Sequence, residues 1–396
     1  MRFLHTADWH LGKNFYSVSL IEDQKYFLEK IFSLLESAKD EKNPYSALLI
    51  PGDIYDRAVP ASDASVLLDS LLSRLKNNFP ELAILILSGN HDSAKRLSFA
   101  SSFLKKDGIY IASSASDITT PIEIDGVCFY QLPFLTSLEK EGEDGFSILR
   151  TRSEICAEAC RRILLSHQIK NNTKRAVLCA HETCFEKGDE TYSVGTAEIV
   201  RPETFLGFDY VALGHIHKMM CVKKSNPAIW YSGSPLAYSF DDSGKKGVLS
   251  VEIDTKTGGT TVEKIAIEPL HPVKRLSLTF SELDSADEAQ KWENCYIEAI
   301  CTDNTSADNP MAILEKRYPH ILSFRRKAKK RSGESEEFEM RKKIMQSGKK
   351  DADVMSDMFS LFMKDLYGDK LDEKQFQSEK AVFDFLCAEA EREEEQ

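Results

Sequence analysis

The stretch LAILILSGNHD, residues 82–92, joins an apolar run to a small residue, a glycine and three polar side chains. The run from Leu82 to Leu87 has the length and composition of a fully buried strand. The amide, the imidazole and the carboxylate that follow are side-chain types that bind metals or transfer protons. Taken alone, the stretch is equally consistent with an ordinary strand that ends in a polar turn.

Four more apolar runs have the same strand-like character. They are RFLHTA (2–7), SALLI (46–50), RAVLCA (175–180) and DYVALG (209–214). Polar residues of metal-binding type follow each run at once: Asp8 and His10; Asp53 and Asp56; His181; His215 and His217. Each cluster alone is explained as well by a turn or a packed histidine, so only the whole series is specific. Because functional groups gather beyond the carboxyl ends of strands in α/β sheets, we expect the clusters to converge.

The pattern between the runs predicts an α/β fold. Segments of helical period around 22–39 and 63–77 separate the first three runs, as in a layered strand–helix–strand arrangement. Alternating segments further on predict antiparallel strands in a second sheet. These segments are VCFYQL (127–132), AIWYSG (228–233), GVLSVEID (247–254) and TVEKIAIEP (261–269). We therefore predict a two-sheet sandwich flanked by helices, with a small α+β capping domain and a C-terminal helical tail.

Changes of composition mark the expected domains. Pro269 and Pro272 indicate a boundary, and the chain becomes highly charged from about Ser332. The predicted division is a main domain 1–270, a capping domain 271–331, a charged linker 332–350 and C-terminal helices 351–396. In the last part, four apolar residues have helical spacing, and this face either packs on the body of the protein or binds a partner. They are Met355, Met358, Phe359 and Phe362.

Composition limits the class of protein. The chain has 396 residues, of which 42% are hydrophobic and 29% charged, and no apolar run approaches the ~18 residues that span a bilayer. The start, MRFLHTADWH, lacks the apolar core of a signal peptide, so we expect a globular protein of the cytoplasm with no membrane partner. Nine cysteines, none spaced as CxxC, argue against a disulfide framework or a thiolate zinc site.

Charge is unevenly distributed. The net charge of −12 disfavours binding of nucleic acid through overall charge. The run RRKAKKR (325–331) is strongly basic, and it either contacts phosphates through residues such as Arg325 and Arg326 or forms a solvated loop.

The candidate ligands indicate two metal ions. Carboxylates, imidazoles and an amide without cysteine favour manganese, iron or magnesium over structural zinc. Seven ligands are too many for one tetrahedral ion and suit two ions that share a carboxylate. They are Asp8, His10, Asp53, Asn90, His181, His215 and His217. Two ions ~3.5–4 Å apart stabilise the attacking and leaving oxygens of a phosphoryl displacement, so the predicted chemistry is phosphoester hydrolysis.

The series DxH, GDxxD, GNHD, H and GHxH resembles the signature of the calcineurin-like metallophosphoesterases. The motifs TADWHLGK, GDIYDR, SGNHD, ALGHIH and YSGSPLAYSF are similar to those of its bacterial nuclease branch. The resemblance covers residues 1–270, and beyond them only the architecture is alike. It implies one metal held by Asp8, His10, Asp53 and His217, and a second held by Asp53, Asn90, His181 and His215. It also implies that His91 faces the scissile phosphate, that the carboxylate of Asp56 orients His91, and that Arg57 contacts phosphate.

The resemblance further implies a manganese-dependent exonuclease and endonuclease that acts on DNA ends and hairpins and is associated with the nucleoid. Its partners would be a second copy, through the helices around 22–39 and 63–77, and a coiled-coil ATPase bound by the C-terminal helices, which together make a heterotetramer. Two alternatives remain open on the residues alone: a phosphoesterase for small molecules or phosphoproteins, and a non-catalytic assembly subunit.

Overall fold

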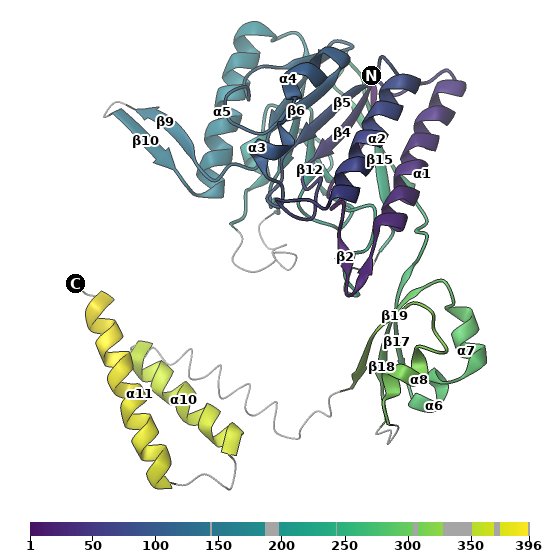
Figure 1. The fold of residues 1–396 in the computed structure, drawn as a ribbon. Coiled ribbons are helices and arrows are strands. Elements are labelled where there is room, and N and C mark those ends of the chain that lie inside the picture. Colours follow the sequence, from purple (N-terminus) through teal and green to yellow (C-terminus); the bar gives the residue numbers. More distant parts are fainter. Residues whose placement is uncertain are drawn as a thin grey trace. The chain divides into compact units, whose positions relative to one another are not determined.

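The computed structural model describes residues 1–142, 145–186, 198–242, 244–303, 308–327, 351–367 and 373–394. The chain divides into two compact units, Met1–Arg326 and Lys327–Gln396 (Figure 1). The predicted linker 332–350 and positions 328–331 of the basic run lie outside the described residues.

The first sheet has six strands in the order β16-β15-β1-β4-β5-β6. β1, β4, β5 and β6 run parallel, and β15 and β16 are antiparallel to their neighbours. β4 and β5 are buried along their whole length, as expected of central strands covered on both faces. The strands are β1 Arg2–His5, β4 Ala47–Pro51, β5 Ala83–Leu87, β6 Ile109–Ala112, β15 Gly247–Ile253 and β16 Thr260–Ala266.

The second sheet also has six strands, in the order β13-β14-β12-β11-β8-β7. The four inner strands are parallel, and β13 and β7 pair with them in antiparallel fashion at the two edges. The strands are β7 Ile122–Ile124, β8 Val127–Leu132, β11 Arg175–His181, β12 Tyr210–Gly214, β13 Met220–Lys223 and β14 Ala228–Tyr231.

Two details of the predicted second sheet are wrong. β8 and β14 pair in parallel with β11 and β12, so they are not purely antiparallel strands. β15 and β16 are antiparallel as expected, but they belong to the first sheet. The alternation of side chains reports which face of a strand is buried, and it does not report the direction of the neighbouring strand.

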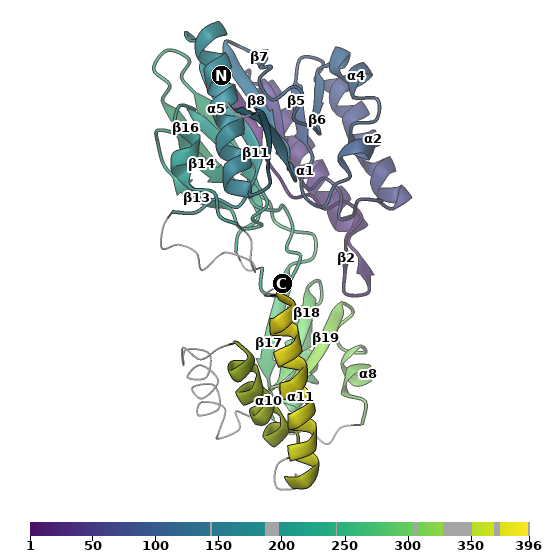
Figure 2. The same ribbon diagram turned by 90° about the vertical axis from the view of Figure 1, so that its left-hand side faces the viewer.

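The two sheets pack face to face and are flanked by helices. The ring of Phe3 makes edge contacts with Phe129 and Tyr210 of the opposite sheet, with centroids 5.5 Å apart in both cases. Helices α1 (Ile21–Asp40) and α2 (Ser62–Asn78) cover the first sheet, and α5 (Arg152–Lys170) covers the second (Figure 2). This architecture confirms the predicted α/β sandwich.

The helices form where apolar periodicity predicts them. Phe27, Ile31 and Leu35 recur at a spacing of four residues on α1 and are all buried. On α2, Leu68, Leu71 and Leu75 are buried in the same core, so most of its apolar face contacts the chain's own sheet. The smaller elements of this part are β2 Asn14–Phe15, β3 Val18–Ser19, α3 Ala94–Leu97, α4 Ser101–Leu104, β9 Leu138–Gly142 and β10 Gly145–Leu149.

A smaller parallel sheet, β17-β18-β19, follows within the same unit and has its own apolar core. Its elements are β17 Val273–Leu278, α6 Phe280–Leu283, α7 Ala286–Lys291, β18 Tyr296–Cys301, α8 Pro310–Leu314 and β19 Ile321–Arg326. The buried carboxylate of Asp23 on α1 accepts hydrogen bonds from His271 (3.1 Å) and from the hydroxyl of Tyr296 (2.8 Å). These bonds attach the α+β part to the first helix.

The second unit contains α10 (Asp351–Tyr367) and α11 (Glu373–Glu394). The two helices pack on one another through stacked rings of Phe359 and Phe383, whose centroids are 4.3 Å apart. Among the described residues, no helix combines the length and apolarity needed to cross a membrane.

Candidate metal centre

The loops that carry the predicted ligands leave the same edge of the sandwich. β1, β4 and β5 are parallel in one sheet, β11 and β12 are parallel in the other, and the loops after all five strands meet. Main-chain bonds tie the loops together: the amide of Asp8 donates to Gly52 (3.2 Å) and that of His10 to Asp53 (2.9 Å). The amide of His215 donates to the carboxylate of Asp8 at 2.9 Å across the two sheets. The polar clusters thus converge, although they are far apart in the sequence.

One group of ligand atoms is formed by Asp8, His10 and His217, and all its atoms lie within 4.8 Å of one another. The Nε2 atoms of His10 and His217 are 3.1 Å apart. Nδ1 of His10 is buried and has no hydrogen-bond partner among the described residues.

A second group is formed by Asp8, Asp53 and His181, again within 4.8 Å. Nε2 of His181 lies 3.5 Å from Oδ2 of Asp53. Oδ1 of Asn90 lies 2.9 Å from Nε2 of His181 and 3.0 Å from Nδ1 of His215. Asp8 belongs to both groups, and Oδ2 of Asp53 is also 3.6 Å from Nε2 of His10 in the first group, so both carboxylates lie near histidines of each group.

The electrostatics of these residues suit divalent cations. Burial raises the pKa of Asp8 to about 6, although positive charge on His181 lowers it, so a cation bound beside this carboxylate would favour its charged form. Burial would lower the pKa of His181, but Asp53 and Asp8 outweigh it and raise the pKa to about 9. Burial lowers the pKa of His215 to about 4 and that of His217 to about 3, so both rings are neutral at pH 7, the form that binds metals.

The backbone at the ligand positions is unusual. Asp8, His10, Asp53 and His215 all have positive φ, at 54°, 44°, 49° and 99°. Such conformations are costly for residues other than glycine and cluster at functional sites. Gly89 is required because a Cβ there would lie 2.2 Å from Oδ1 of Asp53. The small residue in SGNHD therefore lets the loop of Asn90 pass close to Asp53.

His91 lies at the exposed side of the centre. Its amide donates to Oδ1 of Asp53 at 2.9 Å, and its Nδ1 donates to the main-chain oxygen of Asp56 at 3.0 Å. The carboxylate of Asp56 instead accepts from Lys13 at 2.6 Å and lies 3.6 Å from Nδ1 of His10. Asp56 thus contacts His91 through its main chain, and its side chain is held by Lys13.

Asp92 supports this loop. Its carboxylate accepts from the amides of Gly89 (3.0 Å), Ile54 (3.1 Å) and Tyr55 (2.9 Å). One side chain therefore ties the loop after β5 to the loop after β4.

The other predicted contact residues lie on the loop after β4, at the end of β19 and on α10. Arg57 is 78% exposed and its Nε is 3.7 Å from Oδ2 of Asp56. Arg325 and Arg326 end β19, where Arg325 pairs with the buried carboxylate of Glu298. Met355, Met358, Phe359 and Phe362 lie on α10 in the second unit.

Several neighbours of the centre were not singled out from the sequence. The ring of Tyr238 lies 5.2 Å from that of His10 and 5.6 Å from that of His217. Tyr238 belongs to the motif YSGSPLAYSF, but the motif does not indicate a role for this residue. Lys13 likewise belongs to a quoted motif, TADWHLGK, without an indicated role.

Arg152 had no sequence signal, because its partners are distant in the chain. It pairs with the buried Glu182, at 3.1 Å from Nε to Oε2, and its guanidinium lies 4.1 Å from the ring centroid of Phe134. The Phe134 ring is in turn 6.3 Å from that of His181.

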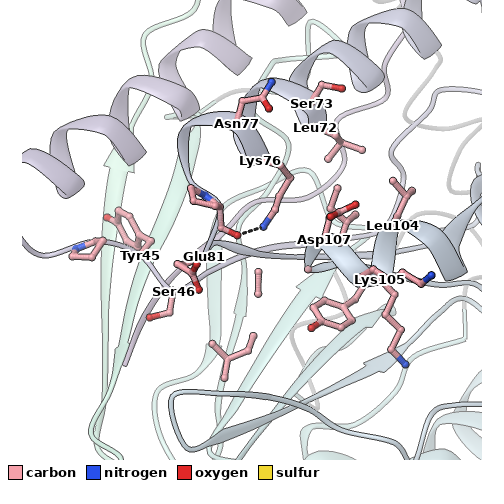
Figure 3. Close-up of a pocket in the computed structure, with 18 of the residues that line it drawn as sticks. Tyr45, Ser46, Leu72, Ser73, Lys76, Asn77, Glu81, Leu104, Lys105 and Asp107 are labelled. Atoms are coloured by element: carbon pink, nitrogen blue, oxygen red, sulfur yellow. Dashed lines mark hydrogen bonds between the residues drawn. The ribbon is translucent and has the colours of Figure 1, made fainter.

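A cavity of about 1200 Å³ lies away from the centre (Figure 3). Its lining includes Ser46, Ala83 and Ile109, which precede or begin β4, β5 and β6. It therefore opens at the edge of the first sheet opposite to the candidate ligands, and none of the predicted site residues lines it.

Comparison with known proteins agrees with this geometry. The profile described as "Calcineurin-like phosphoesterase" matches residues 1–219. The SbcD component of the SbcCD nuclease of Staphylococcus epidermidis is 32% identical over 335 residues, which span 82% of this chain and 85% of that protein. The solved structure of a Vps29 single mutant from Entamoeba histolytica aligns with 68% of this chain and 100% of its own at 12% identity, but its TM-score of 0.24 supports no conclusion.

The matched profile spans all five loops that carry the candidate ligands. The clustered carboxylates and imidazoles provide sites for divalent metals, so the protein is a metal-dependent phosphoesterase. The chain belongs to the calcineurin-like phosphoesterase family.

Proposed function

We propose that this protein is the nuclease component of an SbcCD-like DNA repair complex and hydrolyses phosphodiester bonds of DNA ends and hairpins. The observation that carries the proposal is the complete set of predicted ligands at one edge of the sandwich, in a chain related to the SbcD component of an SbcCD nuclease. The presence of every predicted ligand favours a catalytic protein over a non-catalytic assembly subunit.

The ligands divide between two divalent ions. We assign Asp8, His10, Asp53 and His217 to one ion, and Asp53, Asn90, His181 and His215 to the other. Oδ2 of Asp53 lies 3.6 Å from Nε2 of His10 and 3.5 Å from Nε2 of His181, which supports its role as the shared carboxylate. When bound, the two ions supply Lewis-acid stabilisation of the attacking and leaving oxygens. We assign manganese, with magnesium and iron as alternatives, because the ligands are oxygen and imidazole nitrogen atoms.

His91 is the proposed catalytic acid. A carbonyl oxygen only accepts, so the bond to Asp56 places a proton on Nδ1 and leaves Nε2 for the substrate. To act as an acid, His91 must also carry a proton on Nε2. In the reaction, the oxygen of water bonds to phosphorus and its proton passes to solvent, while the bond from phosphorus to the leaving oxygen breaks and that oxygen takes the Nε2 proton of His91. Asp56 orients the ring through its main-chain oxygen.

A polynucleotide substrate is supported by the exposed cations and by the additional parts of the chain. Arg57 lies exposed beside the centre, where its guanidinium can meet a phosphate. Arg325 and Arg326 are both exposed at the end of β19. We propose a nuclease domain 1–270, a capping and DNA-binding domain 271–331, a linker 332–350 and partner-binding helices 351–396.

The proposed protein partners are a second copy of the chain and an SbcC-like coiled-coil ATPase. Together they would form a heterotetramer in the cytoplasm, near the nucleoid. On α10, Met355 is 52% and Phe362 is 55% exposed, while Phe359 packs on α11. We therefore assign Met355, Met358 and Phe362 to the surface for the ATPase, with Phe359 holding the helix pair together.

Most apolar residues of α1 and α2 are buried in their own chain, so the surface for the second copy is smaller than their composition implies. Val66 of α2 remains 66% exposed. Phe99 (83%) and Phe103 (72%) are further exposed apolar residues of the main domain.

A cleavage assay tests the proposal. The purified protein, with and without the ATPase partner, is incubated with linear duplex DNA, hairpin DNA and a small phosphodiester, in manganese, in magnesium or in chelator. We expect manganese-dependent cleavage of both DNAs. Hydrolysis of the small ester with no cleavage of DNA under any condition would support a small-molecule phosphoesterase instead.

A further inference from the structure

Lys246 is a buried lysine beside the candidate metal centre. Its side chain is only 7% exposed. Its ammonium group donates to Oδ1 of Asp242 (2.5 Å), to the main-chain oxygen of His217 (3.0 Å) and to the hydroxyl of Ser234 (3.1 Å). A buried charge is costly unless it is paired and hydrogen-bonded, and here all three donors are used.

The sheet topology explains why this residue reaches the centre. Lys246 immediately precedes β15, which runs antiparallel to β1 with Leu249 opposite His5. An antiparallel strand begins at the edge where its neighbour ends. Lys246 therefore lies at the edge from which the loops of His10 and His217 depart, although it is 29 positions from His217.

The ion pair also holds an aromatic ring. The second carboxylate oxygen of Asp242 accepts from the amide of Tyr238 at 3.3 Å, and the hydroxyl of Tyr238 donates to the main-chain oxygen of Trp9. The Tyr238 ring makes edge contacts with the imidazoles of both His10 and His217. The pair of Lys246 and Asp242 thus restrains the main chain of one candidate ligand and the rings of two.

We propose that Lys246 is a positioning residue for the metal site of His10 and His217. Its hydrogen bond fixes the carbonyl of His217, and its pairing with Asp242 fixes the Tyr238 ring against both imidazoles. Its charge alone would repel a nearby divalent ion, so its contribution comes from these hydrogen bonds. The inference rests on the proposed division of the ligands between two metals.

The variant Lys246→Met removes the ammonium group and keeps most of the aliphatic stem. Loss of a group that orients a ligand weakens metal binding by about 10- to 100-fold. We expect this loss at one of the two sites, with the site of His181 and His215 unchanged. Lys76→Met is the matched control, because Lys76 also donates to two main-chain oxygens, Pro80 (2.6 Å) and Leu82 (2.7 Å), but at the opposite edge of the sheet (Figure 3).

The test is a calorimetric titration of manganese into the metal-free full-length protein, combined with electron paramagnetic resonance. The wild type and Lys76→Met should bind two ions that are magnetically coupled. Lys246→Met should bind one ion normally and show the hyperfine pattern of isolated manganese until the metal is in large excess. Two unchanged sites in folded Lys246→Met would overturn the positioning role, and equal weakening of both sites would also overturn it.

The double variant Lys246→Met/Asp242→Asn separates positioning from stability. The double variant removes both charges of the ion pair. If Lys246 were needed only for folding, thermal stability and metal affinity would recover together in this variant. We expect thermal stability to recover while the weakened metal site remains weak, and recovery of both would refute the inference. If the wild type itself binds fewer than two ions, the two-metal assignment fails, and this inference fails with it.

Discussion

Replacement of Gly52 by alanine should damage the metal centre through a single methyl group. Gly52 lies between β4 and Asp53 and has a φ of +92°. A Cβ at this position would lie 2.1 Å from Nδ1 and 2.6 Å from Cγ of His181. That imidazole is fully buried, and its Nδ1 contacts the main-chain oxygen of Pro51 at 2.9 Å. The ring must therefore move to admit the methyl group.

The expected cost has two parts. The left-handed conformation costs an alanine about 1–2 kcal/mol relative to its preferred backbone. Crowding in a well-packed interior adds about 1–3 kcal/mol. Gly126→Ala is the control, because Gly126 has a φ of +79° but, apart from its chain neighbours, no atom of the described residues lies within 4 Å of the added Cβ. The control therefore has only the cost of the left-handed conformation. The difference in stability between the two variants measures the cost of crowding at His181.

Urea unfolding of both metal-free variants gives the two changes in the free energy of unfolding. We expect Gly52→Ala to be less stable than Gly126→Ala by about 1–3 kcal/mol. Manganese titration should show a loss of at least about tenfold in affinity at one site of Gly52→Ala only, as expected when a ligand is displaced. Equal stability of the two variants, with both metals bound normally, would refute the close packing of His181 against Gly52.

Three further predictions concern catalysis, metal and partner. His91→Ala should keep both metals but cleave about 10²- to 10⁴-fold more slowly. Asp53→Ala should lose metal as well as activity. If elemental analysis showed equal metal loss in the two variants, the division of roles would be contradicted. His167→Ala, in α5, is the control and should cleave like the wild type. Chelation with EDTA should abolish cleavage and manganese should restore it, and cleavage that persists in EDTA would contradict a metal-dependent mechanism. Phe362→Asp should weaken binding to the ATPase by more than about tenfold, measured by calorimetry. The melting temperature should stay unchanged, because this residue is 55% exposed. An unchanged affinity would show that Phe362 is not part of the interface.

The candidate ligands could be identified from sequence because two local rules act together. Apolar runs such as the one from Leu82 to Leu87 identify buried strands, and polar residues directly after parallel strands must lie at one edge of a sheet. The family resemblance then separated His91 from its neighbour Asn90. The structure places these residues as those rules require, with Asn90 beside His181 and His91 on the exposed side.

The sheet arrangement could not be obtained in the same way. Strand direction depends on pairing between distant segments, and side-chain alternation carries no information about it. For this reason the prediction makes β8 and β14 antiparallel and assigns β15 and β16 to the wrong sheet.

The supporting contacts were also inaccessible from sequence. Lys246 meets His217, and Arg152 meets Glu182, only because the folded chain brings distant loops together. A buried lysine or arginine has no local pattern that distinguishes it from an exposed one. The contact between His91 and the main-chain oxygen of Asp56 was missed for a different reason: the sequence shows the carboxylate but not its pairing with Lys13.

The central claim is that two ions share the carboxylate of Asp53. A crystal structure of the manganese-loaded protein, with anomalous scattering recorded at the manganese absorption edge, tests it most directly. We predict two peaks about 3.5–4 Å apart, one beside His10 and His217 and one beside His181 and His215, with oxygen atoms of Asp53 within bonding distance of both. A single peak, or two peaks of which only one contacts Asp53, would contradict the account.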